Sequence, residues 1–236
     1  MILDERSQMA LYRLMNRGVI AELGHPVKEG KESLIIHGLS SEGEELAIKV
    51  HTSRVFSGAE KKRYLLGDWR LRHAKHEIRL RTEAIWAEKE YRNLSRLAKI
   101  GIPGPRPVAF EENIVVMTFV GEQGQAAPQL NRAGNIDYGR IAPAVMKSLR
   151  ALVHRAKLVH GDLSSYNILV WKRDPYLIDL SHAVLTSHPD SARLLNRDVQ
   201  KVACFFGRQG VRTSAFYELL KSLLEEVGQR ADSEPL

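Results

Sequence analysis

Two aspartates and an asparagine stand close together in residues 158–180, a segment that reads LVHGDLSSYNILVWKRDPYLIDL. Asp162 and Asn167 lie between short apolar runs that predict strands, so we expect these two side chains to share one loop. Asp179 follows the next apolar run and would sit at the end of the neighbouring strand, after a turn at residues 172–175. Hard divalent cations prefer oxygen ligands, and phosphoryl transfer uses such a cation beside a carboxylate. The segment therefore predicts a site for a divalent cation and a phosphate, with ordinary turn-forming aspartates as the alternative.

A lysine in an earlier strand and a glutamate in the following helix form a second feature. Lys49 lies within residues 46–50, where side chains alternate between two faces, and a strand lysine ordinarily faces water. In the helix predicted for residues 84–99, Glu90 falls within the apolar face, whereas Glu88 falls on the opposite face. Because a buried carboxylate requires a cation nearby, we expect a Lys49–Glu90 ion pair and a solvated Glu88. The other residues on the face of Glu90 are Trp86, Asn93, Leu94 and Leu97.

Two stretches have the composition of nucleotide contacts. Residues 30–33 precede the first strand of a hairpin, where a glycine lets the backbone approach a phosphate closely; a plain turn is the alternative. Further along, a strand over residues 114–120 runs into GEQGQAAP, which is typical of a hinge. Adenine would occupy an apolar slot there and bind the backbone of residues 118–120. The nucleotide-binding candidates are Gly30, Lys31, Glu32, Ser33, Lys49, Met117, Thr118 and Val120.

The order of the predicted elements indicates an α+β protein with a small antiparallel sheet followed by a mainly helical part. Strands are expected at residues 34–36, 46–50, 107–110 and 114–120. Helices are expected at residues 7–18, 84–99, 141–155, 191–206 and 213–227. We interpret residues 1–236 as a single domain of two lobes, with an N-terminal lobe at 1–120, a hinge at 118–128 and a C-terminal lobe at 129–236.

The bulk properties narrow the class of protein. The net charge of +7 over 236 residues suits either a nucleic-acid partner or a bound nucleotide, and the basic segment 60–83 is either an RNA contact or a solvated loop. The single cysteine, Cys204, excludes an internal disulfide, fits a reducing compartment and is expected in the core. The chain begins without the apolar run of a signal peptide, and no apolar window reaches the ~20 residues of a membrane span. We therefore expect a cytoplasmic protein without a membrane partner.

The order of strand lysine, helix glutamate, hinge, HGD with a following asparagine, and strand-ending aspartate resembles the protein-kinase fold. In detail the sequence is similar to the RIO family of atypical serine/threonine protein kinases, nearest its first and third subfamilies. The similarity is collinear over roughly residues 10–210. The motifs that carry it are GKES at 30–33, AIKV at 47–50, WAEKEYRNL at 86–94, GIPGPRP at 101–107, VVMTFVG at 115–121, HGDLSSYNIL at 160–169, LIDLSHAV at 177–184 and RDVQKVACFF at 197–206.

This resemblance implies a two-lobed protein that binds ATP with Mg2+, or Mn2+, between its lobes and acts as an ATPase as well as a protein kinase. It implies Asp162 as the catalytic base, Asn167 and Asp179 as metal ligands, and Lys49, held by Glu90, as the phosphate-binding lysine. It also implies a phospho-aspartate at Asp179, and a role in maturation of the small ribosomal subunit, with its precursor or rRNA as partner and an unknown protein substrate.

The chain departs from these relatives in several places. No DFG motif follows the last strand, and only a short run separates Asp179 from the next helix, so an activation loop and a peptide-docking platform do not fit. Lys28 and Glu29 replace two hydroxyl residues of the family's phosphate loop, while Ser165 and Thr118 each replace a glutamate. Two alternatives remain open: a small-molecule or tRNA-modification kinase of related fold, and a nucleotide-binding ribosome assembly factor with weak catalysis.

Overall fold

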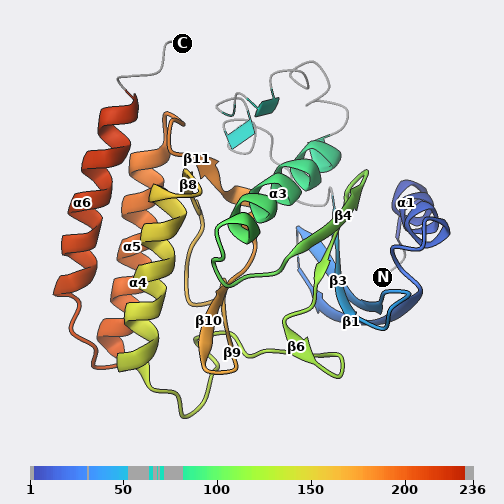
Figure 1. Ribbon diagram of the computed structural model, residues 1–236, viewed down its shortest axis with the longest axis horizontal. Helices are drawn as coiled ribbons and strands as arrows, with labels where there is room; N and C mark the ends of the chain where they lie inside the picture. The colour runs from blue at the N-terminus through green and yellow to red at the C-terminus, as the bar shows by residue number, and fades with distance from the viewer. Residues whose placement is uncertain are drawn as a thin grey trace. The chain divides into compact units, whose positions relative to one another are not determined.

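The computed structural model describes residues 3–30, 32–52, 64, 65, 68, 70, 71 and 82–231, which form two compact units (Figure 1). The first unit consists of Met1–Ser95 and Pro105–Ala127, and the second of Arg96–Gly104 and Pro128–Leu236. Lys31 and most of the basic segment 60–83 lie outside the described residues, so the expected phosphate or RNA contacts there stay predictions.

The first unit is built on an antiparallel sheet with the strand order β1-β2-β3-β5-β4. β2 and β3 form the predicted hairpin, in which Ile35 lies opposite Lys49. On its other side β3 pairs with β5, so Lys49 also lies opposite Val115 in the middle of the sheet. The strands are β1 (Glu22–Glu29), β2 (Ser33–Leu39), β3 (Glu45–His51), β4 (Pro107–Glu111) and β5 (Ile114–Thr118).

The sequence does not predict β1, and its composition explains why. The strand contains Gly24 and Pro26, which are both disfavoured in strands, and its side chains are almost all exposed, so no alternation of apolar residues marks it. Its register against β2 shifts on both sides of Pro26. β1 approaches closely at Gly38, where a Cβ would lie 2.8 Å from the Glu22 carbonyl oxygen.

The two faces of the sheet contact different helices. Ile48 and Val50 pack in one apolar cluster with Leu14 of α1. Lys49 points to the opposite face, as the alternation of β3 predicts, and there it contacts Glu90 of α3. The helices of this unit are α1 (Glu5–Asn16) and α3 (Thr82–Lys99), whose last turn belongs to the second unit.

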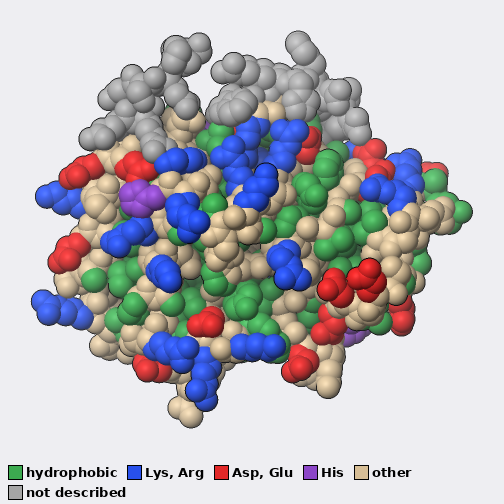
Figure 2. Space-filling model, viewed as in Figure 1, with side chains coloured by type: hydrophobic (Ala, Val, Ile, Leu, Met, Phe, Trp, Pro, Cys, Tyr) green, Lys and Arg blue, Asp and Glu red, His purple; other side chains and the backbone are tan. Residues whose placement is uncertain are grey.

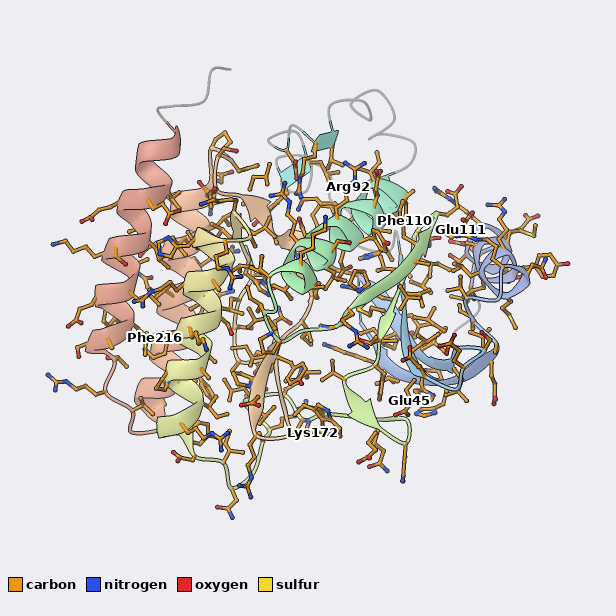
Figure 3. All side chains as sticks on the ribbon, in the orientation of Figure 1. Glu45, Arg92, Phe110, Glu111, Lys172 and Phe216 are labelled. Carbon is orange, nitrogen blue, oxygen red and sulfur yellow. The ribbon has the colours of Figure 1, made fainter. Side chains whose placement is uncertain are left out.

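α1 begins two residues before the predicted start because Asp4 caps it. The Asp4 carboxylate accepts a hydrogen bond of 2.8 Å from the Ser7 backbone N–H, which would otherwise have no partner in the first turn. Gly18 follows the helix with a φ of 72°. Arg13 ties the helix to β4 through a 3.0 Å contact with Glu111, whose place beside α1 is seen in Figure 3.

The segment interpreted as a hinge contains a small hairpin of β6 (Gly121–Glu122) and β7 (Gln125–Ala126). Glu45 of β3 anchors its tip, because its carboxylate accepts hydrogen bonds from the Gln123 and Gly124 N–H groups at 3.1 and 2.6 Å. Residues 121–124 are therefore a fastened turn of the first unit. The chain passes to the second unit after Ala127.

The second unit packs α4, α5 and α6 side by side (Figure 1), and Phe206 of α5 stacks on Phe216 of α6 with ring centroids 5.4 Å apart (Figure 3).

Short strands of the second unit form two antiparallel pairs, β8 with β11 and β9 with β10. The turn between β9 and β10 is shorter than predicted: Lys172 and Arg173 both have positive φ, and Asp174 already belongs to β10. The elements are α4 (Tyr138–His154), β8 (Leu158–Val159), β9 (Ile168–Trp171), β10 (Asp174–Leu177), the 3-10 helix η2 (Leu180–His182), β11 (Val184–Leu185), α5 (Ser191–Arg208) and α6 (Ser214–Ala231).

The prediction that Cys204 lies in the core is wrong. Cys204 is exposed on α5, although it stands among apolar residues, because its helical neighbours Val202, Ala203 and Phe206 occupy the buried face.

On the side seen in Figure 2, Lys and Arg side chains form several separate groups, so the positive charge does not mark one continuous patch there. None of the helices in the described residues has the length and apolar character needed to cross a bilayer.

Candidate functional site

Asp162 and Asn167 lie in the same loop of the second unit, between β8 and β9, as the sequence predicts. The Asn167 side-chain Nδ2 donates a hydrogen bond of 2.9 Å to the Asp162 carbonyl oxygen and lies 3.4 Å from its carboxylate Oδ2. This arrangement uses the donor end of the Asn167 amide, and the amide oxygen Oδ1 is chemically suited to serve as a ligand.

One residue, Ile178, separates Asp179 from the end of β10, and a backbone hydrogen bond holds the chain beside the same loop. The Ile178 N–H donates to the Asn167 carbonyl oxygen at 3.1 Å, so the residue before Asp179 is fixed against Asn167. Asp179 itself has a left-handed conformation, with φ 61° and ψ 68°. Its Oδ1 accepts a hydrogen bond of 2.7 Å from the Ser181 hydroxyl.

Gly161 allows the loop to approach η2. Its φ is +79°, and an added Cβ would lie 2.4 Å from the His182 carbonyl oxygen, well inside van der Waals contact. No other residue type has both the conformational freedom and the small size required here. The glycine of HGD is thus explained by the close packing of two loops that carry the candidate residues.

Asp198 is a residue of the candidate site that the sequence reasoning missed. It is buried in α5 and accepts hydrogen bonds from the Gly161 and Leu163 N–H groups, at 2.7 and 3.0 Å, on either side of Asp162. Arg197 donates to the Gly161 carbonyl oxygen. Burial raises the pKa of Asp198 to about 7, against the opposing effect of these N–H donors and Arg197. The signal was present: a lone carboxylate on the apolar face of a predicted helix needs a buried partner.

His160 is fully buried beside the same loop. Its Nε2 lies 3.1 Å from the Ile178 carbonyl oxygen and donates to it. Burial lowers its pKa, which favours the neutral imidazole, while the nearby Asp179 carboxylate opposes that effect. We therefore interpret His160 as a neutral spacer that joins the loop of Asp162 to the segment of Asp179.

The donor set fits a hard cation. Asn167 supplies an amide oxygen and Asp179 a carboxylate, and Mg2+ is commonly held by one or two protein oxygens together with phosphate oxygens and water. No cluster of three His, Cys, Asp or Glu residues suited to a metal occurs among the described residues. The site is thus suited to a cation that arrives with a phosphate ligand.

In the first unit, Lys49 and Glu90 form the predicted ion pair, with Nζ and Oε1 2.7 Å apart. His51, two residues along β3, places its Nε2 2.8 Å from the other carboxylate oxygen of Glu90. All three side chains are buried. Both oxygens of Glu90 are therefore used, and the Lys49 ammonium is held in a fixed position. The contact of His51 was missed, although the alternation of β3 places it on the face of Lys49.

Glu88 is less exposed than the solvated position predicted for it, and its neighbour Lys89 is buried. The Glu88 side chain is only 20% exposed and pairs with Arg92 one turn later. Lys89 is fully buried, with its Nζ 5.0 Å from the centre of the Trp86 ring. Burial lowers the pKa of Lys89 to about 7, although the Asp68 carboxylate opposes this shift. Tyr64 and Arg70 also contact α3, at Trp86 and Asn93 respectively, and these contacts could not be predicted from periodicity.

The expected nucleotide contacts of the first unit are only partly compatible with its hydrogen bonds. The Gly30 N–H donates to the Ser33 carbonyl oxygen at 2.9 Å, so this N–H is already used at the connection from β1 to β2. The N–H groups of Thr118 and Phe119 donate to backbone carbonyl oxygens of Arg106 and Glu45, so they are not available to adenine. Of the predicted hinge donors this leaves the Val120 N–H. The side chains of Met117 and Val120 are buried.

Comparison with known proteins identifies the family. The model of the RIO domain matches residues 34–219, which is most of the chain. The chain belongs to the RIO domain family. Among its relatives are the serine/threonine-protein kinase rio1 of Dictyostelium discoideum, 37% identical over 95% of this chain and 40% of the relative, and human RIO1, 33% identical over 93% of this chain and 39% of the relative. Rio1 of the archaeon Haloferax volcanii is 33% identical over 89% of this chain and 71% of its own length.

The RIO fold is also found among solved structures. The Rio2 kinase of Chaetomium thermophilum superposes with a TM-score of 0.69 at 24% identity, over 91% of this chain and 67% of that chain. The same kinase as an ADP/Mg2+-phosphoaspartate complex gives a TM-score of 0.67 at 23% identity, over 92% of this chain and 66% of that one. These likenesses confirm the α+β, kinase-like fold. The chain spans less than half the length of the first two curated relatives named above.

Proposed function

We propose that this RIO protein is an atypical serine/threonine protein kinase that binds Mg2+-ATP and transfers its γ-phosphoryl group. The observation that carries the proposal is the hydrogen bonding of the second unit, in which Asn167 donates to Asp162 and accepts from Ile178, the residue before Asp179. Such a set combines a base with hard-cation ligands, as phosphoryl transfer requires. The named kinases among the relatives support the same reaction.

Each residue has a separate role in this proposal. Asp162 orients the nucleophile and accepts its proton, while Asn167 and Asp179 hold the cation. The bound cation, Mg2+ or Mn2+, neutralises phosphate charge and so makes the phosphorus easier to attack. In the first unit, Lys49 binds phosphate oxygens because Glu90 and His51 keep its ammonium in place. Met117 and Val120 contact the adenine ring, and the Val120 N–H donates to it.

We further propose Asp179 as a phosphate acceptor in an ATPase cycle. One of its carboxylate oxygens would form a bond to the γ-phosphorus while the bond to the β–γ bridging oxygen breaks and ADP leaves. Water would then hydrolyse the acyl phosphate to inorganic phosphate. The phosphoaspartate in the solved Rio2 complex supports this assignment. The left-handed backbone of Asp179 and its bond from Ser181 fix the direction of the carboxylate.

The test is turnover of radiolabelled ATP by the whole chain with and without a protein acceptor. Asp162→Ala should lower phosphate transfer by several powers of ten, because no other group in the loop can take its place. An acyl phosphate at Asp179 should be labelled by [γ-32P]ATP and released by hydroxylamine. Wild-type turnover in Asp162→Ala would contradict the catalytic assignment, and a label stable to hydroxylamine would contradict the aspartyl phosphate.

We propose a cytoplasmic role in maturation of the small ribosomal subunit, with its precursor particle or rRNA as partner. The net charge of +7 is suited to binding a polyanion. Adding purified small-subunit precursor should stimulate ATP hydrolysis, and adding mature large subunit should not. Phosphorylation of a sugar or tRNA-linked acceptor without such stimulation would instead favour the small-molecule or tRNA-modification alternative. Binding to the precursor with no hydrolysis would favour a non-catalytic assembly factor.

A further inference from the structure

One face of α5 is directed at the loop that carries Asp162. Arg197 and Asp198 bind the backbone of this loop at Gly161 and Leu163. One turn later, Lys201 places its Nζ 3.0 Å from Oδ1 of Asp162. The spacing of these α5 residues, one and three apart, puts them on one side of the helix. Backbone and side chain of the loop are thus held by different residues of the same helix.

The contact of Lys201 has little structural value of its own. The side chains of Lys201 and Asp162 are 42% and 43% exposed, and an ion pair so exposed contributes little to the stability of the fold. The loop backbone does not need it, because the buried Asp198 already accepts both N–H groups beside Asp162. The ion pair therefore affects mainly the orientation of one carboxylate.

Lys201 is also the cation that the loop itself lacks. Residues 158–167 contain neither lysine nor arginine, and the His160 ring is directed at the Ile178 carbonyl oxygen. Arg197 is directed at a backbone carbonyl. The Lys201 ammonium contacts the carboxylate of Asp162 directly and places a positive charge beside it. Its contact is to Oδ1, whereas Oδ2, within the described part of the chain, has just the long 3.4 Å contact with Asn167 and keeps lone pairs for another donor.

We propose that Lys201 is a positioning residue for phosphoryl transfer, which acts by holding Asp162 so that Oδ2 faces the nucleophile. This inference rests on the proposed kinase function of the loop. As the hydroxyl oxygen bonds to the γ-phosphorus and the bond to ADP breaks, the hydroxyl proton passes to Oδ2 of Asp162. Lys201 neither gives nor takes a proton, and it keeps the accepting oxygen in line.

The first test separates kcat from KM in the whole chain. Lys201→Met should lower kcat about 10- to 100-fold with the KM for ATP unchanged, because a misdirected base slows the chemical step without loosening the nucleotide. Lys201→Arg should recover most of the lost kcat, since a guanidinium can still hold Oδ1. Lys221→Met on α6, an exposed helix lysine outside the site, is the matched control and should keep wild-type constants.

A double-mutant cycle decides whether the effect passes through Asp162. In an Asp162→Ala background, adding Lys201→Met should change the residual rate less than twofold, because the residue it positions is gone. An undiminished effect in that background, or wild-type kcat in Lys201→Met, would overturn the inference while leaving the proposed function intact. If Asp162→Ala by itself kept wild-type turnover, both the proposed function and the role of Lys201 would be wrong.

Discussion

Asp179 has a backbone conformation that few residues adopt. The left-handed region is accessible to glycine and, at a small cost, to asparagine and aspartate, whose short polar side chains can bond locally. In Asp179 that local bond comes from Ser181, two residues on. The residue type at this position is thus restricted twice, by the proposed chemistry of its carboxylate and by its φ of 61°.

These two restrictions can be separated by substitution. Asp179→Asn should lower ATP turnover by at least about 10³-fold with little change in melting temperature, because asparagine tolerates the same φ but cannot accept the phosphoryl group. Asp179→Ala should lose the same activity and about 1–2 kcal/mol of stability besides. ATP turnover and thermal unfolding of both variants measure the two effects. If Asp179→Asn were as unstable as Asp179→Ala, the predicted restriction by the left-handed backbone would be wrong.

Lys89 predicts an unusual pH dependence of stability. In the folded protein it loses its proton near pH 7, whereas in the unfolded chain it keeps the proton up to about its ordinary value of 10.5. The unfolded state therefore binds more protons between these values, so the free energy of unfolding should rise with pH there, by up to ~1.4 kcal/mol per pH unit. Urea titrations of wild type and Lys89→Met from pH 7 to 10 should differ by this slope, and parallel curves would contradict it.

At the scale of elements, the site depends on loops that approach more closely than side chains allow. Gly161 and Gly210 have nearly the same φ, +79° and +78°, but a Cβ at Gly161 would meet the His182 carbonyl oxygen, whereas at Gly210 it would meet nothing within 4 Å. The two glycines therefore share a left-handed backbone but differ in the room for a side chain. Substituting each one distinguishes the cost of the backbone conformation from the cost of a steric clash.

Gly161→Ala should cost clearly more stability than Gly210→Ala. The latter should lose only the left-handed penalty of about 1 kcal/mol and keep full activity. The former should add a steric clash that moves Asp162 away from η2, and activity should fall with stability. Chemical denaturation and ATP turnover of the two variants provide the comparison. Equal losses in both would mean that the loops adjust without cost.

At the scale of the whole molecule, the proposed nucleotide binding predicts a change in the stability of the folded chain. A ligand that binds only the folded chain stabilises it by about 2.7 kcal/mol at a concentration one hundred times its Kd. Mg2+-ATP should therefore raise the melting temperature, and EDTA should remove most of the shift if Asn167 and Asp179 hold the cation. The same scan on Lys49→Met should show a reduced shift, and an unchanged shift would exclude Lys49 from the phosphate contact.

Local sequence patterns were sufficient to predict several contacts and loops of this protein. The alternation in β3 and the helical period of α3 predicted that Lys49 and Glu90 would face each other, because both periodicities are short and a buried charge needs a partner. The loop of Asp162 and Asn167 and the place of Asp179 after a strand followed in the same way. The resemblance to RIO kinases then indicated the fold, which the family match and the solved structures confirm.

Features that depend on contacts between residues distant in sequence were determined only by the tertiary structure. β1 is held by pairing with β2 and has no apolar alternation; the hairpin at residues 121–126 is fastened by Glu45; and Cys204 is exposed because of how α5 packs. Asp162 was visible from its motif, but its surroundings come from α5, more than thirty positions later. Sequence periodicity predicts on which face of its own helix or strand a side chain lies. The residue that it contacts on that face is determined only when separate helices and strands pack together.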